Sequence, residues 1–338
     1  MKPRYLIETL LSLALLVASA CSSLERERGQ VQEQVPVSFS AVVAGEMPAT
    51  RASNMVDESV LKDKGFGVFG CYTGLHPYAA SDVTANFMYN QEVKWDGSRW
   101  TYEPVKYWPS GEGEATDTGT GSSPQYVSFF AYAPYSDGTE ECISAFSLFQ
   151  EHTNPWLLYC LSERVEDQVD LLYAEPHLDC TKPSVNSRLE FSFKHALACL
   201  GDQVVITNES DPPVDITLKE VKIDYTLTAK ARMVLWNRGA ANWQVLPSGD
   251  VLTTRSVTLL SSGSESLPTT STGWTSTGKG LFCIPAEATG YPQKATIQIT
   301  YIVDSFPDVE RQVSSVLMLK TLLEEGKYTK LEIHLTNQ

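Results

Sequence analysis

Cys21 is the residue of this chain best placed for covalent modification, because it follows an apolar segment and the small residues Ala18-Ser19-Ala20. The apolar segment, Leu10 to Ala18, is too short to cross a bilayer as a helix and is preceded by two basic residues. This arrangement is typical of a lipoprotein signal, removed as residues 1–20, in which the cysteine thiol is acylated, with palmitate for example. Glu8 inside the signal is unusual, and an ordinary secretory signal or a buried N-terminal helix are the alternatives.

Side chains that could catalyse a reaction do not form any known constellation. The five histidines are scattered, and the sequence has no Cys-x-x-Cys pair, no Gly-x-Ser-x-Gly turn and no phosphate-binding glycine loop. Asp137-Gly138 lacks the alternating acids of a calcium loop. His195, in Phe193-Lys194-His195-Ala196-Leu197, is a candidate general base, but a structural histidine at a strand end is the favoured interpretation. We therefore predict no enzyme, with no catalytic residue, no cofactor and no metal.

The composition limits the classes of partner. The formal charge of −15 becomes −16 without residues 1–20, which carry two basic residues and one acidic residue. Such an acidic chain is repelled by phosphate backbones, so we predict no nucleic-acid partner. Of the seven cysteines, six follow Cys21, and their spacing matches no compact disulfide framework. Disulfides and buried free thiols both stay open.

The segment after the predicted lipidation site has two parts. Residues 21–34 are polar and charged, which indicates a tether above the membrane. Apolar residues then alternate with polar or small ones, which is the pattern of a half-buried strand. These residues are Val35, Val37, Phe39, Ala41 and Val43. Arg51 follows in a loop of small residues, where a protease could cut; Arg26 and Arg28 are competing sites.

Short β-prone runs continue to the end of the chain. Residues 86–108 indicate a hairpin with Phe87, Tyr89, Gln91, Val93 and Trp95 on one face and Asp96-Gly97 at the turn. Residues 140–165 are less regular and could hold a short helix. The fold class predicted is all-β, with two antiparallel β-sandwich domains in series, at 35–183 and 184–338. Pro176 and Pro183 bracket the predicted boundary.

Three tryptophans near the hairpin have two interpretations. Alternation with apolar neighbours favours core packing for Trp95 and Trp100. Trp108, which precedes Pro109 and a glycine-rich loop, could instead stack on a sugar, so it is our candidate glycan contact.

Several segments, in order, resemble the fimbrillin family of Bacteroidetes, the subunits of type V pili, and its minor-fimbrillin-like branch in particular. They include the lipoprotein start, Val37-Ser38-Phe39-Ser40, Thr50-Arg51-Ala52, Asn86 to Gln91, Tyr107-Trp108-Pro109, Val127 to Pro134, Asp170 to Ala174, Phe193 to Leu197, Ile284-Pro285 and Gly326-Lys327-Tyr328. The resemblance implies two transthyretin-like sandwiches and export as a surface-exposed outer-membrane lipoprotein. It also implies cleavage after an arginine, here Arg51, and displacement of the strand Val35–Val43 by a strand of another fimbrial subunit.

The C-terminal end departs from the stalk subunits of that family. After Tyr328–Leu335, which we interpret as the last strand of the second sandwich, only three residues remain. A chain that receives a strand but does not donate one would occupy the tip or an accessory position of a fimbrium and could contact a host or bacterial surface ligand. This inference fails if Tyr328–Leu335 is itself the donor. The alternative function is a surface lipoprotein that binds glycans and never polymerises.

Overall fold

Apolar residues at every second position give this chain its strands. In β12 (Ile216–Thr228), Val221, Ile223, Tyr225 and Leu227 are buried and the residues between them are half-buried, as the sequence predicts. The computed structural model describes residues 34–44, 55–79, 83–109, 124–183, 187–244, 246, 252–285, 292–304, 308–319 and 323–336. Within these ranges almost all regular structure is strand, which confirms the predicted all-β class.

The N-terminal sheet contains the first strand at one edge. Its order is β1-β10-β8-β5-β2-β3-β4, and β9 also pairs with β5. The strands are β1 (Phe39–Val43), β2 (Phe66–Gly74), β3 (Met88–Trp95), β4 (Trp100–Thr101), β5 (Tyr126–Ala133), β8 (Leu172–Ala174), β9 (His177–Cys180) and β10 (Leu189–His195). An aromatic core cluster that includes Phe39, Phe66, Phe129 and Phe191 lies on this sheet.

A second sheet combines strands from both halves of the chain. Its order is β14-β13-β7-β6, with β6 (Ile143–Phe146), β7 (Trp156–Cys160), β13 (Lys230–Arg238) and β14 (Ala240–Gln244). Residues 140–165, where the sequence left a short helix open, contain β6 and β7, and a single 3-10 turn at Val165–Asp167 begins at their end.

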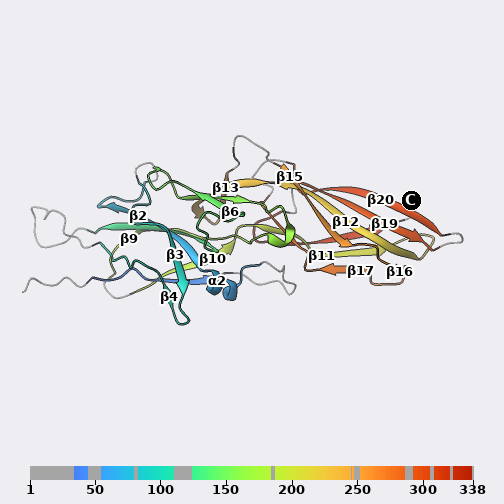
Figure 1. Ribbon diagram of the computed structural model, residues 1–338, viewed down its shortest axis with the longest axis horizontal. Coiled ribbons are helices and arrows are strands. Elements are labelled where there is room, and N and C mark those ends of the chain that lie inside the picture. The colour runs from blue at the N-terminus through green and yellow to red at the C-terminus, as the bar shows by residue number, and fades with distance from the viewer. Residues whose placement is uncertain are drawn as a thin grey trace, which may run out of the picture.

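Two further sheets form the C-terminal half. One has the order β15-β12-β19-β20, with β16 also on β12, and the other has the order β17-β11-β18, with β21 also on β11. The strands are β11 (Ala198–Asn208), β15 (Leu252–Leu260), β16 (Glu265–Leu267), β17 (Trp274–Thr277), β18 (Leu281–Cys283), β19 (Lys294–Val303), β20 (Val309–Met318) and β21 (Tyr328–Leu335). Figure 1 shows these strands toward one end of the molecule and β2, β3 and β9 toward the other.

Two pairings differ from the antiparallel pattern that we expected. β1 pairs with β10 in parallel, and β21 pairs with β11 in parallel. Each of these pairs joins strands far apart in the sequence, so no short turn constrains the direction. The hydrogen bonding also assigns β10 to the N-terminal sheet, whereas the predicted boundary between 183 and 184 would separate it from that sheet.

The predicted hairpin is present, and Val93 is buried as predicted, but the faces change at Met88 and Tyr89. Trp95 pairs with Trp100 across the turn. Between the pairs Val68–Gln91 and Gly70–Met88, β2 advances by two residues and β3 by three. Asn90, with φ 42°, occupies this bulge. The bulge turns Met88 into the core and leaves Tyr89 exposed, which reverses the predicted alternation.

Helix α2 (Glu58–Lys64) packs beside β3 and β1 and was not predicted. Asp57 caps its first turn by accepting hydrogen bonds from the backbone N–H groups of Ser59 and Val60. Gly65 ends it with φ 70°, where a Cβ would lie 2.5 Å from a backbone oxygen. The helix buries Leu61 in the aromatic cluster under β1.

Candidate functional site

The first strand is held by backbone hydrogen bonds on two different partners. Its leading residues pair antiparallel with 106–108: the Val37 N–H donates to the Lys106 carbonyl, and the Trp108 N–H donates to the Val35 carbonyl, both at 2.9 Å. The next residues, β1, run parallel to β10, from Phe39 opposite Leu189 to Val43 opposite Phe193. We call residues 35–44 the first-strand segment.

The first-strand segment turns its alternate side chains inward. Val37 and Phe39 are each 2% exposed, and Val35, Ala41 and Val43 pack partly buried against the same cluster. These are the five residues that the sequence singled out.

Phe39 lies among the aromatic rings of Phe66, Tyr102, Phe129 and Phe191. We call these four rings the seat of the first-strand segment. The ring centroid of Phe39 lies 5.6–5.7 Å from those of Tyr102, Phe129 and Phe191. Aromatic pairs at these separations add to the free energy gained by burial alone. The Tyr102 hydroxyl also donates to the Val37 carbonyl at 2.8 Å. Burial raises the pKa of Tyr102 to about 12, so this hydroxyl stays protonated and able to donate.

The aromatic residues that form the seat were not recognised as a site from the sequence. Tyr102 lies within the predicted hairpin, residues 86–108, and Phe129 and Phe191 lie in β5 and β10. Their signal is composition: Phe66, Phe129, Phe191 and Phe193 all lie in strands of a single sheet. The pairing that brings them around one residue cannot be read from spacing alone.

The other predicted site residues have different outcomes. Cys21 and Arg51 lie outside the described residues. Trp108 is 6% exposed, and its ring packs edge-on against Phe129 at 5.8 Å. Its indole nitrogen is buried without a hydrogen-bond partner. The expectation that Trp108 offers a face to a glycan is therefore corrected: its ring is buried in the aromatic cluster.

His195 has a structural partner, as the sequence favoured. Its Nδ1 lies 2.7 Å from Oδ2 of Asp170, a fully buried carboxylate that also accepts the Val56 N–H at 3.1 Å. Burial alone would lower the pKa of His195, but the hydrogen bond and the charge of Asp170 outweigh it and raise the pKa. The pair ties the end of β10 to the chain just before α2.

We expect this pair to make stability depend on pH. Because the folded pKa of His195 is raised, its contribution is complete below the unfolded value of about 6.5 and is lost as pH rises through the folded pKa. The free energy of unfolding should therefore fall more steeply above neutrality in the unmodified chain than in His195→Gln. Urea unfolding of both chains at several pH values measures this difference, and parallel curves would contradict it.

All six described cysteines are free thiols. Cys71, Cys142, Cys199 and Cys283 are buried, and the other two are partly buried. Burial raises the pKa of Cys71 to about 12, so its thiol stays protonated and unreactive. Among the described residues, no group of three or more His, Cys, Asp or Glu side chains is placed to hold a metal ion. None of the helices described is long and apolar enough to cross a membrane.

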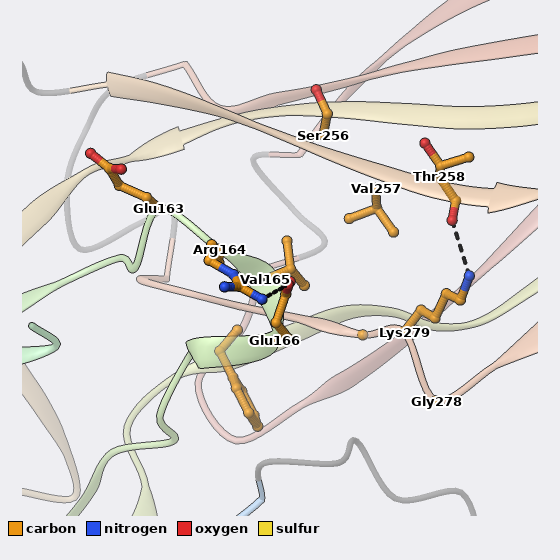
Figure 2. A pocket seen from close by; sticks show the side chains of 11 residues that line it. Glu163, Arg164, Val165, Glu166, Ser256, Val257, Thr258, Gly278 and Lys279 are labelled. Atoms are coloured by element: carbon orange, nitrogen blue, oxygen red, sulfur yellow. Dashed lines mark hydrogen bonds and ion pairs between the residues drawn. The ribbon is translucent and has the colours of Figure 1, made fainter.

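A hollow of about 370 Å³ lies between the 3-10 turn and β15 (Figure 2). Its cations already have partners. Arg164 forms ion pairs with Glu166 and Asp167, and Lys279 donates to the Thr258 carbonyl at 3.0 Å. Each of these contacts lies on one side of the hollow, and together they leave little free charge for a ligand.

Known proteins are similar to this chain in sequence and in fold. The sequence model of the family described as fimbrillin-like matches residues 50–338. The chain is 26% identical over 199 residues to fimbrium subunit Fim1C of Phocaeicola vulgatus. The aligned part covers 56% of this chain and 48% of that relative, so the chain spans about half the relative's length. The fold is similar to the crystal structure of a fimbrial protein from Bacteroides vulgatus, with a TM-score of 0.60, 19% identity, and coverage of 89% of this chain and 95% of that one. Because the family match covers most of the sequence, the chain belongs to the fimbrillin-like family.

Proposed function

We propose that this chain is a structural fimbrial subunit that assembles by strand exchange. In this proposal, Cys21 carries a lipid that anchors the precursor at the outer membrane surface. A protease then cuts after Arg51 and frees the first-strand segment, and a strand from another subunit takes its place. The observation that supports it best is the position of β1. It is an edge strand that pairs with β10 and with no other described strand, and its inward side chains pack into the aromatic cluster.

The energetics require that removal and replacement be coupled. Burying the five inward side chains contributes on the order of 6–10 kcal/mol, at about 1.5–3 kcal/mol for each large one. That is comparable to the net stability of a whole domain, roughly 5–15 kcal/mol. An empty seat would also expose the backbone edge of β10 together with Phe191. A donor strand with alternating apolar residues would fill the aromatic cluster and would also pair with the backbone edge of β10.

The position of the predicted cut agrees with this assignment. Arg51 lies between the last residue of the first-strand segment and Met55, where the described chain resumes. The family match begins at residue 50, so the segment before the cut lies outside the matched part.

We further propose a tip or accessory position in the fimbrium. This is supported by β21, which pairs with β11 of its own chain from Cys199–Tyr328 to Asn208–Leu335 and buries Leu331 and Leu335. A strand held in this way is already used by its own fold. A strand donated by this chain would then have to come from elsewhere in it.

Limited trypsin digestion of the precursor tests the cut. We expect a new N-terminus at Ala52 and retention of the first-strand segment on the cut protein until a donor peptide is added. Arg51→Ala should abolish this fragment, whereas Arg28→Ala, in the tether, should leave it unchanged. Mass spectrometry identifies the fragments. A chain that stays intact at Arg51, or a cut chain that never exchanges its segment for a donor, would contradict the proposal.

A further inference from the structure

The edge strand β20 has one of the features by which proteins protect such edges, the charged residue Arg311 on the core side of the sheet, but lacks the others. It is ten residues long, contains no proline, and pairs with β19 in an unbroken register from Val303–Val309 to Lys294–Met318. Natural edges are usually short, bulged, or interrupted by proline or charge. Figure 1 shows β20 at the outer margin of the C-terminal half, beside β19. Its only charged residues, Glu310 and Arg311, are near one end.

The backbone of β20 presents one set of residues outward. The Leu319 N–H donates to the Gln293 carbonyl at 2.9 Å, so odd-numbered residues direct their N–H and carbonyl groups to β19. Even-numbered residues from Glu310 to Met318 therefore direct theirs away from it. No described strand pairs with that side.

On the core side of the sheet, β20 carries an interrupted apolar stripe of Val309, Val313 and Leu317, with Arg311 and Ser315 between them. Residues directly opposite in an antiparallel pair point to the same face. Val313 faces the same side as buried Ile299, and Leu317 the same side as buried Ala295. Val309 lies on this face too. Val313 is nevertheless 38% exposed and Val309 43% exposed.

We propose that β20 pairs antiparallel with β20 of a second copy of this chain, about a two-fold axis through Val313. Because the free groups lie on even residues, an even residue must oppose an even one. With Val313 on the axis, Val309 opposes Leu317 of the second copy, and Val313 opposes itself. With Ser314 on the axis, Arg311 would oppose Leu317 instead. The inner apolar stripe selects the first register.

The result is a closed dimer with one continuous sheet across both copies. The interface is isologous, so it ends with two chains and does not extend into a fibre. It uses the C-terminal sheet only, whereas the first-strand segment lies in the N-terminal sheet. The pairing is therefore independent of strand exchange.

Cysteine crosslinking of the detergent-solubilised full chain tests the register. Copper(II) phenanthroline oxidises two adjacent thiols to a disulfide, with release of two protons. Val313→Cys should crosslink to itself. Arg311→Cys and Ser315→Cys should crosslink only when the two chains are mixed, because these residues oppose each other across the axis. The unmodified chain, with its native cysteines, is the control. Self-crosslinking of Arg311→Cys, or none of Val313→Cys, would overturn the register.

The mass in solution tests the interface without added cysteines. Val313→Lys places two lysines opposite each other and should weaken the dimer roughly tenfold or more. Val316→Lys makes the same change on the outer face, opposite Glu310 of the second copy, and should leave the dimer intact. Light scattering over a concentration series gives both affinities, and thermal unfolding checks that each variant is folded. A monomeric unmodified chain at all concentrations, or equal effects of both lysines, would refute the proposal.

Discussion

Phe39→Ala should destabilise the N-terminal sheet by about 3–5 kcal/mol, the range for a buried phenylalanine. Phe39 is 2% exposed and lies among four aromatic rings, three of which (Phe66, Phe129 and Phe191) belong to hydrogen-bonded strands that resist collapse into the cavity. Urea unfolding followed by tryptophan fluorescence measures the change. In a cut chain, the same substitution should also speed release of the first-strand segment.

A matched pair of variants separates burial from strand propensity. Val37→Ala and Val42→Ala remove the same atoms from the same segment, but Val37 is buried in the aromatic cluster and Val42 is only half-buried on the other face. We expect Val37→Ala to cost about 1–2 kcal/mol more than Val42→Ala. Equal costs, or a Phe39→Ala variant as stable as Val42→Ala, would show that the seat is not what holds the segment.

Asp170→Ala should cost about 3–5 kcal/mol, because it leaves His195 and the Val56 N–H buried without their acceptor. Asp170→Asn keeps an acceptor oxygen but loses the charge, so it should cost less, and it should lower the pKa of His195 because the charge no longer opposes the effect of burial. Urea unfolding gives the stabilities, and an NMR titration of the imidazole gives the pKa.

Asp137 offers the control for that change. Its carboxylate is exposed and accepts hydrogen bonds only from Thr139, at 2.9 and 2.6 Å. Asp137→Ala should therefore cost much less than Asp170→Ala. A similar cost at both aspartates would mean that the Asp170–His195 pair contributes no more than a surface turn.

Local pattern predicted the parts of the fold that short-range physics determines. The alternation at Val35–Val43 predicts which side chains point inward, because a strand repeats every two residues. Asp96-Gly97 predicts a turn, because glycine accepts a positive φ. β5 begins and ends where its apolar run does, at Tyr126 and Ala133. The identity of the inward residues of the first strand was therefore available before any coordinates.

The features that the sequence could not predict depend on contacts between residues far apart in the chain. The parallel contact between β1 and β10 joins residues 150 positions apart, Phe39 to Leu189. Trp108 is buried where its ring packs on Phe129 of β5 and its backbone pairs with Val35. The bulge at Asn90 depends on how β2 and β3 meet, and it reverses the two faces within one strand. None of these contacts leaves a periodic signal along the chain.

The division of the first-strand segment between two partners has a consequence for how it would leave. Residues 39–43 bond to β10 and residues 35–37 bond to 106–108, with no hydrogen bond in common. The residues on β10 can therefore detach while those on 106–108 stay attached. After a cut beyond residue 44, fraying would begin at Val43 and uncover β10 from its Phe193 end. An incoming strand could then advance residue by residue behind the retreating one, and the hydrophobic groove would never be wholly open to water.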